Sequence, residues 1–454
     1  MPDQTTTLLI LGASGDLTRR LLLPGLGTLL REEPGRTVRV MGADRVELSQ
    51  EDWQAKVRDS LAEAEVPQEV AERVVADSTY HRTDLLEKDQ LSALLEQTGF
   101  PLALYFALPP AVTVKVCVLL EELRVPEGTR LALEKPFGDS LESAQELNRQ
   151  LLRVVPEGSI FRIDHFLGVS TILNLIGLRF ANRLLQPIWT AEHIERVEIC
   201  YDETLALEGR AGYYDHAGAL MDMIQSHLLE ILAFFAMEAP ATMQPEEIRG
   251  LKAQALRAVQ PWGHDPAAAS RRARYTAGEV EGTQVPDYAS EEGVDPERET
   301  ETLAQLTVQL DNARWSGVPF VLRSGKALRD KAKRVVVVFR EPAHTPTGLS
   351  PAPGPDRLML ELKPGSVALE LSMNAEGDPF DLEQKELAAE LGKSRMLPYG
   401  EILGAILDGN PLLTIRGDEA EELWRIVEPV YAAWRAGEVP LEEYAAGSDG
   451  PGGW

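Results

Sequence analysis

The sequence has 454 residues and carries 45 Lys and Arg against 72 Asp and Glu, a formal net charge of −27. This length predicts two or three domains, and 44% hydrophobic with 26% charged residues excludes a wholly disordered chain. So acidic a chain lacks the basic surface that nonspecific nucleic-acid binding needs, and an anionic substrate would require a local basic cluster.

Cysteine content and apolar runs bear on the compartment. Cys117 and Cys200 are too few for a disulfide framework, and we expect both to be buried thiols in a reducing compartment. The N-terminus has no basic signal-peptide region, and the longest apolar runs (residues 21–30 and 228–237) are shorter than the roughly 20 residues that span a bilayer. We therefore expect a cytoplasmic protein with no membrane or nucleic-acid partner.

Short apolar strands alternate with helices over residues 1–165. The predicted strands cover residues 6–11, 37–41, 102–108 and 130–133, and the predicted helices cover residues 17–31, 50–76 and 111–123. Pro24 would bend or interrupt the first helix. The alternation predicts a Rossmann-like, doubly wound α/β domain with a parallel sheet that binds a dinucleotide.

The pattern changes over residues 166–454. The predicted helices cover residues 173–185 and 219–235, and the predicted strands cover residues 195–201, 303–310, 335–340, 357–362 and 366–371. We expect an α+β domain for substrate binding and oligomerisation, built on a large, mainly antiparallel sheet. Residues 278–301 are expected to form a long surface loop that could act as a lid, and residues 445–454 a frayed tail.

A glycine-rich turn, Gly12-Ala13-Ser14-Gly15-Asp16-Leu17, lies between the first predicted strand and helix. Glycines let the backbone approach a pyrophosphate, and the helix N-terminus offers unpaired N–H groups. The Gly-x-x-Gly spacing alone also fits an ordinary tight turn, whereas its strand–turn–helix context favours a dinucleotide. After the second strand, Arg45 favours NADP, because an arginine there accepts the 2′-phosphate. Asp44 also allows NAD, because an acid there pairs with the ribose 2′-hydroxyl.

Three further strings carry candidate chemistry. Glu134-Lys135-Pro136-Phe137-Gly138 puts a lysine at the carboxyl end of a parallel strand, where such folds bind ligands. The other two are Arg162-Ile163-Asp164-His165-Phe166-Leu167-Gly168 and Gln225-Ser226-His227-Leu228-Leu229. Each alone is a weak signal, since surface lysines are common and a lone histidine on an apolar helix is more often a core residue than a base.

Together with Ala107-Leu108-Pro109-Pro110, Leu178-Arg179-Phe180-Ala181-Asn182 and Arg323-Ser324-Gly325-Lys326, these strings resemble the glucose-6-phosphate dehydrogenase family. They follow the family's order and approximate spacing over nearly the whole chain. The resemblance implies a two-domain oxidoreductase of the pentose phosphate pathway, a homodimer or homotetramer, that moves hydride from C1 of glucose 6-phosphate to NADP.

The resemblance also implies roles for individual residues. His227 matches the general base, Asp164 the carboxylate that orients it, and Lys135 a lysine between cofactor and sugar. The implied sugar-hydroxyl ligands are Glu203 and Asp222, and the implied phosphate-side residues are His165, Lys326 and Lys331. The implied cofactor contacts are Gly12, Ser14, Gly15, Asp16, Leu17, Arg45, Tyr105 and Lys135. We expect no metal, because no two histidines pair with acids or cysteines at metal-ligand spacing.

Two positions depart from the family's pattern. Phe166 stands where the family has a tyrosine and Val169 where it has a lysine, and both usually reach the substrate phosphate. A second interpretation is therefore a dehydrogenase of the same fold acting on a hexose without the phosphate or with another C6 substituent. A third is an oxidoreductase of another family with a Glu-Lys-Pro turn, and a fourth is a non-catalytic, cofactor-binding regulatory protein. The presence of both His227 and Asp164 argues against the last.

Overall fold

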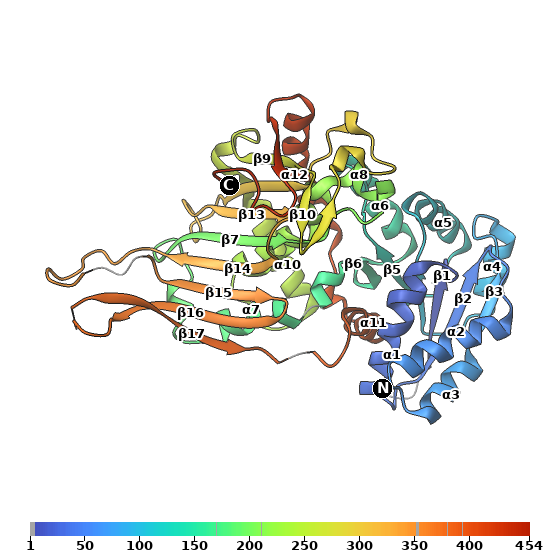
Figure 1. Cartoon of the computed structure of the whole chain (residues 1–454). Helices are drawn as coiled ribbons and strands as arrows, with labels where there is room; N and C mark the ends of the chain where they lie inside the picture. Colours follow the sequence, from blue (N-terminus) through green and yellow to red (C-terminus); the bar gives the residue numbers. More distant parts are fainter. Residues whose placement is uncertain (1–4, 169, 210, 351–353, 379, 393) are drawn as a thin grey trace. The chain divides into compact units, whose positions relative to one another are not determined.

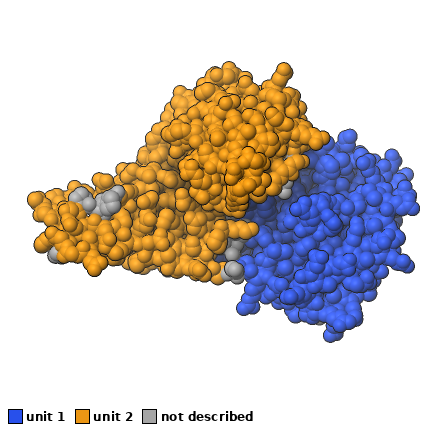
Figure 2. All heavy atoms as spheres, viewed as in Figure 1, with its two compact units in different colours: residues 1–170, 240–250, 394–421 blue, residues 171–239, 251–393, 422–454 orange. Residues whose placement is uncertain are grey.

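The computed structural model describes residues 5–168, 170–209, 211–350, 354–378, 380–392 and 394–454. The chain forms two units, coloured separately in Figure 2. Unit 1 comprises residues 1–170, 240–250 and 394–421, and unit 2 comprises residues 171–239, 251–393 and 422–454. The first stretch of unit 1 ends near the expected domain boundary, but two later stretches of the chain also belong to unit 1.

Unit 1 contains a six-stranded, all-parallel sheet in the order β3-β2-β1-β4-β5-β6 (Figure 1). Its strands are β1 (Thr6–Leu11), β2 (Val38–Asp44), β3 (Thr79–Arg82), β4 (Leu102–Phe106), β5 (Arg130–Glu134) and β6 (Ile160–Ile163). Every residue of β1 is buried, as expected for a central strand covered on both faces. The strand order reverses beside β1, which creates the crevice where such sheets bind ligands. The predicted doubly wound fold is confirmed.

The helices of unit 1 differ from the prediction at two prolines. They are η1 (Thr18–Leu22), α1 (Leu23–Glu32), α2 (Gln50–Glu63), α3 (Gln68–Asp77), α4 (Lys88–Leu95), α5 (Pro110–Leu123) and α6 (Leu141–Val154), with the short turns η2 (Glu157–Ser159) and η3 (His165–Gly168). The helix predicted over residues 50–76 is two helices: α2 ends at Glu63, and Pro67, which restricts the residue before it, is the N-cap of α3. A π-helical turn, η1, precedes Pro24 and keeps the first helix continuous.

A helix from late in the chain completes the core of unit 1. In α11 (Pro398–Asp408), which the turn η9 (Pro411–Leu413) follows, Ile402, Leu403 and Ile406 are fully buried in the same core as β1 and α1. The two helices approach closely at Gly25 of α1, where an added Cβ would lie 2.7 Å from the Cβ of Tyr399. Unit 1 therefore depends on residues that lie more than two hundred positions after its last strand.

Unit 2 is built on a ten-stranded sheet in the order β17-β16-β15-β14-β7-β13-β12-β9-β18, with β8 paired to β12 (Figure 1). The strands are β7 (Ile194–Asp202), β8 (Val259–Pro261), β9 (Ser270–Thr276), β12 (Leu303–Leu310), β13 (Phe320–Gly325), β14 (Ala332–Phe339), β15 (Arg357–Leu362), β16 (Gly365–Asn374), β17 (Leu382–Glu390) and β18 (Leu441–Ala445). Among the described strands of this sheet, only the β7–β13 and β9–β18 pairs are parallel. The predicted α+β fold with a mainly antiparallel sheet is confirmed.

The remaining helices and turns are α7 (Ser170–Phe180), η4 (Gln186–Ile188), α8 (Ala211–Ala219), η5 (Leu220–Leu228), α9 (Leu229–Ala236), α10 (Pro245–Ala258), η6 (Trp262–His264), η7 (Tyr288–Ser290), η8 (Pro296–Arg298) and α12 (Gly417–Arg435). Among the described residues, one helical run, Ala211–Ala236, is long and apolar enough to cross a membrane by length and composition. Since 83% of its most apolar window is buried inside the protein, it fits a core helix equally well, and it is weak evidence for a membrane span.

Two segments expected to be loose are ordered. Residues 278–301 contain the hairpin β10 (Gly278–Val280) and β11 (Thr283–Val285), and Tyr288 is fully buried beside Tyr275. The prediction that residues 445–454 form a frayed tail is wrong. Its last residue, Trp454, lies 4.7 Å from the Arg271 guanidinium and donates to Glu442 at 3.1 Å. Aromatic side chains, which bury large areas, hold both segments in place.

Candidate active site

The glycine turn closes β1 at the strand-order reversal of unit 1. Gly12 has φ +87°, and a Cβ there would lie 2.2 Å from the carbonyl oxygen of Ala107, so only glycine fits. Gly12, Gly15 and Arg45 line a cavity of about 330 Å³ whose walls also include Thr83–Leu86 and Ala107–Pro109. This cavity lies at the carboxyl ends of β1, β2, β3 and β4, where a dinucleotide binds in folds of this kind.

Asp44 and Arg45, the two residues expected to bear on the choice between NADP and NAD, differ in their surroundings. Oδ2 of Asp44 accepts from the backbone N–H of Ser14 (3.2 Å) and from its hydroxyl (2.7 Å), and Oδ1 accepts from the backbone N–H of Arg45 (2.7 Å). Arg45 is exposed, and within the described part of the chain its guanidinium has no hydrogen-bond or ion-pair partner. A 2′-phosphate would therefore meet an available cation, whereas Asp44 already holds the turn together.

Three other expected cofactor contacts have varied environments. Asp16 is exposed and pairs with Arg20 at 3.1 Å and Arg19 at 3.4 Å, and the bond from Arg20 lowers its pKa. Leu17 is partly buried against the core of unit 1. Tyr105 is fully buried and donates a short hydrogen bond to Glu134. A side chain without exposed atoms cannot touch a ligand, so the burial of Tyr105 argues against a direct cofactor contact.

Glu134, the last residue of β5, is the centre of a hydrogen-bonded network in unit 1. Its Oε1 accepts from the hydroxyls of Tyr105 and Tyr399, the latter at 3.2 Å. Burial raises the pKa of Glu134 to about 7, although both hydroxyl bonds oppose the rise. Lys135 follows directly, at the carboxyl end of the strand, and the network fixes the backbone from which it extends.

Asp164 follows β6, and His165 is the first residue of η3. Asp164 is buried, and its Oδ1 accepts from the backbone N–H of Phe166 at 2.9 Å. The His165 ring stacks on Tyr399, with centroids 6.2 Å apart and planes 10° apart, and meets the Phe166 ring edge-on at 4.9 Å. Phe166 thus supports His165. Val169, the second departure from the family pattern, lies outside the described residues.

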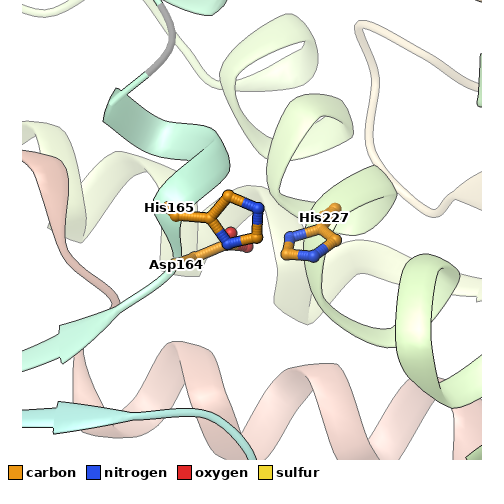
Figure 3. Close-up of side chains that lie close together, drawn as sticks. All are labelled: Asp164, His165 and His227. Carbon is orange, nitrogen blue, oxygen red and sulfur yellow. The ribbon is translucent and has the colours of Figure 1, made fainter. Parts of the chain in front are cut away.

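His227 and Asp222 both come from η5, a π-helical segment in unit 2. Figure 3 draws His227 from this segment together with Asp164 and His165 from the end of β6. Five residues of an α-helix turn by about 500°, which would leave Asp222 and His227 about 140° apart. A π-helix bonds residues i and i+5, so the two lie about one turn apart on the same face. The sequence predicted an ordinary helix here.

A buried carboxylate caps η5. Gly218 has φ +62°, and the chain turns there so that Oε1 of Glu301 accepts from the backbone N–H of Leu220 at 2.9 Å. Negative charge at a helix N-terminus is favourable, yet burial raises the pKa of Glu301 to about 7. A Cβ on Gly218 would lie 2.3 Å from Glu301 Oε1, so this cap also requires glycine. Glu301 has no motif around it and was not predicted.

Glu203 of unit 2 lies between two lysines. Oε2 accepts from Lys326 at 3.0 Å, and Oε1 accepts from Lys333 at 3.1 Å. Burial alone would raise the pKa of Glu203, but the two ammonium groups outweigh it and lower the pKa. The resemblance implied different parts of the substrate pocket for Glu203 and Lys326, a sugar hydroxyl and the phosphate, and in the structure the two side chains are in contact.

Lys331 and Lys333 depart from the expectation. The side chain of Lys331 is 57% exposed and pairs with Glu281 of the segment joining β10 to β11. Lys333 is opposite Tyr201 in the β7–β14 register, is 16% exposed, and joins Glu203. The sequence carries one signal for Lys333: it is a second lysine two positions after Lys331, at the start of β14.

Comparisons with known proteins cover nearly the whole chain. Residues 9–174 match the family described as "Glucose-6-phosphate dehydrogenase, NAD binding domain", and residues 176–453 match "Glucose-6-phosphate dehydrogenase, C-terminal domain". The glucose-6-phosphate 1-dehydrogenase of Gluconobacter oxydans is 39% identical over 97% of this chain and 94% of the relative. That of Bacillus subtilis is 32% identical over 98% and 94%.

Solved structures agree with these relatives. A glucose-6-phosphate dehydrogenase in complex with its substrate glucose-6-phosphate is 28% identical, with a TM-score of 0.89 over 99% of this chain and 96% of that chain. The enzyme of Mycobacterium avium is 30% identical, with a TM-score of 0.85 over 99% and 96%. A 3-ketoreductase from Actinomadura kijaniata, 13% identical with a TM-score of 0.52 over 97% and 100%, shares the fold alone.

Proposed function

The chain belongs to the glucose-6-phosphate dehydrogenase family, and on that premise we propose that it oxidises the C1 hydroxyl of glucose 6-phosphate to the lactone, with NADP as hydride acceptor. The observation that carries the proposal is η5, which turns Asp222 and the buried His227 onto one helix face. One group would hold a sugar hydroxyl and the other would take the C1 hydroxyl proton.

The residues of unit 1 fit NADP. The turn at Gly12 and Gly15 borders an open cavity, and the exposed Arg45 offers a cation beside it. Bound NADP supplies the nicotinamide that accepts hydride. Arg45 would pair with the 2′-phosphate, the Gly12–Gly15 backbone would lie against the pyrophosphate, and Lys135 would extend toward the sugar.

Proton transfer falls to His227. A near-neutral imidazole can accept the hydroxyl proton as the C1–H bond breaks and the C1–O bond gains double-bond character, which contributes typically about 10²–10⁴-fold. Asp164 would orient the imidazole and stabilise it once it is protonated. Glu203, kept ionised by its lysines, and Asp222 would accept from sugar hydroxyls. His165 and Lys326 would face the phosphate.

A second candidate, oxidation of a hexose that lacks the phosphate, is favoured by Phe166. Its ring has no hydroxyl to donate to a phosphate and packs on His165.

We also propose that the protein acts in the cytoplasm as a homodimer or homotetramer.

Initial rates with glucose 6-phosphate and with glucose, each with NADP and with NAD, test the proposed function. We expect the highest kcat/KM for glucose 6-phosphate with NADP. A higher kcat/KM for glucose would transfer the proposal to the unphosphorylated sugar, and no NADPH absorbance with either sugar would refute both.

A further inference from the structure

The Glu203 cluster holds more positive charge than its carboxylate neutralises. Lys326 and Lys333 donate to opposite oxygens of Glu203, at 3.0 and 3.1 Å. The nearby carboxylate of Asp202 is already paired with Arg323 at 2.9 Å, so it does not offset the second lysine. The cluster therefore carries a net charge of about +1 in a chain whose total charge is −27.

The two ammonium groups also have donors to spare. Each lysine ammonium carries three N–H donors. Within the described residues, Lys333 uses two of them, toward Glu203 and the hydroxyl of Tyr201 (2.8 Å), and Lys326 uses one, toward Glu203. The lysine side chains are 16% and 15% exposed, so neither is fully closed off from solvent.

From this excess of charge and donors, we propose that Lys333 is a phosphate-binding residue of the substrate site, acting beside Lys326. The inference rests on the proposed function. An anion that accepts from both ammonium groups offsets the cost of holding two largely buried cations on one carboxylate. One lysine paired with one glutamate has no net charge and would not carry that cost. Phosphate, with several acceptor oxygens, suits the pair.

The placement of Lys331 strengthens the inference. Lys331 was the expected partner of Lys326 on the phosphate side, but it is exposed and paired with Glu281. The sequence also has no cation at Phe166 or Val169. Lys333 supplies the second cation that a sugar phosphate needs, from β14, where it lies opposite Tyr201.

The experiment compares three lysine-to-methionine variants, each of which removes one positive charge. Lys333→Met should raise KM for glucose 6-phosphate by about 10- to 100-fold, the loss expected for one charge-assisted hydrogen bond, with KM for glucose nearly unchanged. Lys331→Met tests the competing assignment, in which Lys331 binds the phosphate. Lys385→Met, on the exposed part of β17 beside Glu383, is the matched control and should leave both constants unchanged.

A binding measurement without turnover completes the test. Inorganic phosphate should raise the unfolding temperature of the wild type and of Lys385→Met, and should raise it much less in Lys333→Met. Lys333→Gln, which keeps a donor toward Tyr201, provides a second variant should the methionine variant not fold, and the same losses are expected. Lys333→Arg should recover part of the affinity.

Two results would overturn the inference. Equal rises in KM for both sugars would mean that Lys333 only holds Glu203 in place, and a KM effect in Lys331→Met without one in Lys333→Met would restore the original assignment. The proposed function fails separately, through an inactive wild type or a wild type that prefers glucose, whereas the phosphate measurement needs no turnover.

Discussion

The glycine turn of unit 1 and the lysine cluster of unit 2 both suit phosphate groups, but they are built differently. The turn uses backbone shape: Gly12 fits against Ala107 because it has no side chain, and the exposed Arg45 supplies positive charge to the cavity. The cluster uses charges that hold one another, with Glu203 between Lys326 and Lys333. The first kind of site is sensitive to sterics and the second to charge balance, and substitutions can separate the two.

The largest effect is expected at the chemical step, which neither phosphate site should influence. His227→Asn should lower kcat by about 10²–10⁴-fold while leaving KM for both substrates within a few-fold, because only the proton acceptor is lost. Steady-state kinetics give both constants. His264→Asn, at an exposed position, is the matched control. Retention of more than about a tenth of kcat would remove His227 from the role of base.

Adding one methyl group at Gly12 tests the glycine turn. Gly12→Ala puts a Cβ 2.2 Å from a carbonyl oxygen at φ +87°, so we expect a loss of about 1–3 kcal/mol in unfolding free energy and a marked rise in KM for NADP. Urea unfolding and initial rates measure the two effects. Gly35→Ala, with open space around it, should change neither. An unaltered KM for NADP in Gly12→Ala would place the cofactor elsewhere.

Removing the positive charge of Arg45 tests how the protein distinguishes NADP from NAD. Arg45→Ala should raise KM for NADP by about 10- to 100-fold and leave KM for NAD nearly unchanged, since only NADP has the 2′-phosphate. The effect should shrink at high salt, because the contact is exposed. Arg58→Ala, at another exposed arginine, provides the comparison. If KM rises equally for NADP and NAD, Arg45 does not bind the 2′-phosphate.

The last prediction concerns the cap of η5 and the pH dependence of stability. The folded-state pKa of Glu301 is raised to about 7 from an ordinary value of 4.5, so the folded protein keeps a proton that the unfolded chain releases. Its contribution to stability is therefore fully present below pH 4.5 and is lost as the pH rises toward 7.

Glu301→Gln removes this titration while keeping an oxygen for the backbone of Leu220. We expect the unfolding free energy of the variant, relative to wild type, to improve by up to about 3 kcal/mol across that pH range. Urea titrations at several pH values measure it, with the exposed Glu279→Gln as control. A parallel pH dependence in wild type and Glu301→Gln would show that Glu301 is ionised throughout.

The sequence predicted those parts of the molecule that depend on local pattern. The parallel strands of unit 1 were visible because each is a short apolar run between turns, and the glycine turn because its residues are consecutive. The break at Pro67 was missed because the residues on either side are equally helical in composition.

The missed features depend on residues that only the fold brings together. Lys333 meets Glu203 through the pairing of β14 with β7, and Glu301 meets Leu220 across 81 positions of sequence. The ordering of the tail likewise depends on Tyr444, whose hydroxyl donates to the backbone carbonyl of Lys326 at 2.7 Å. No local pattern carries such information, and the family resemblance supplied Glu203 and Lys326 but not Lys333.

The place of α11 in the core of unit 1 has a consequence for how the protein is made. A ribosome that has released residues 1–170 has not yet supplied Ile402, Leu403 and Ile406, which that core buries. At about 5–20 residues per second, the missing helix follows after roughly 10–50 s. During that interval the nascent Rossmann-like segment exposes an apolar groove beside α1. A truncated fragment of residues 1–170 would keep that groove exposed permanently, so it should require a chaperone or aggregate.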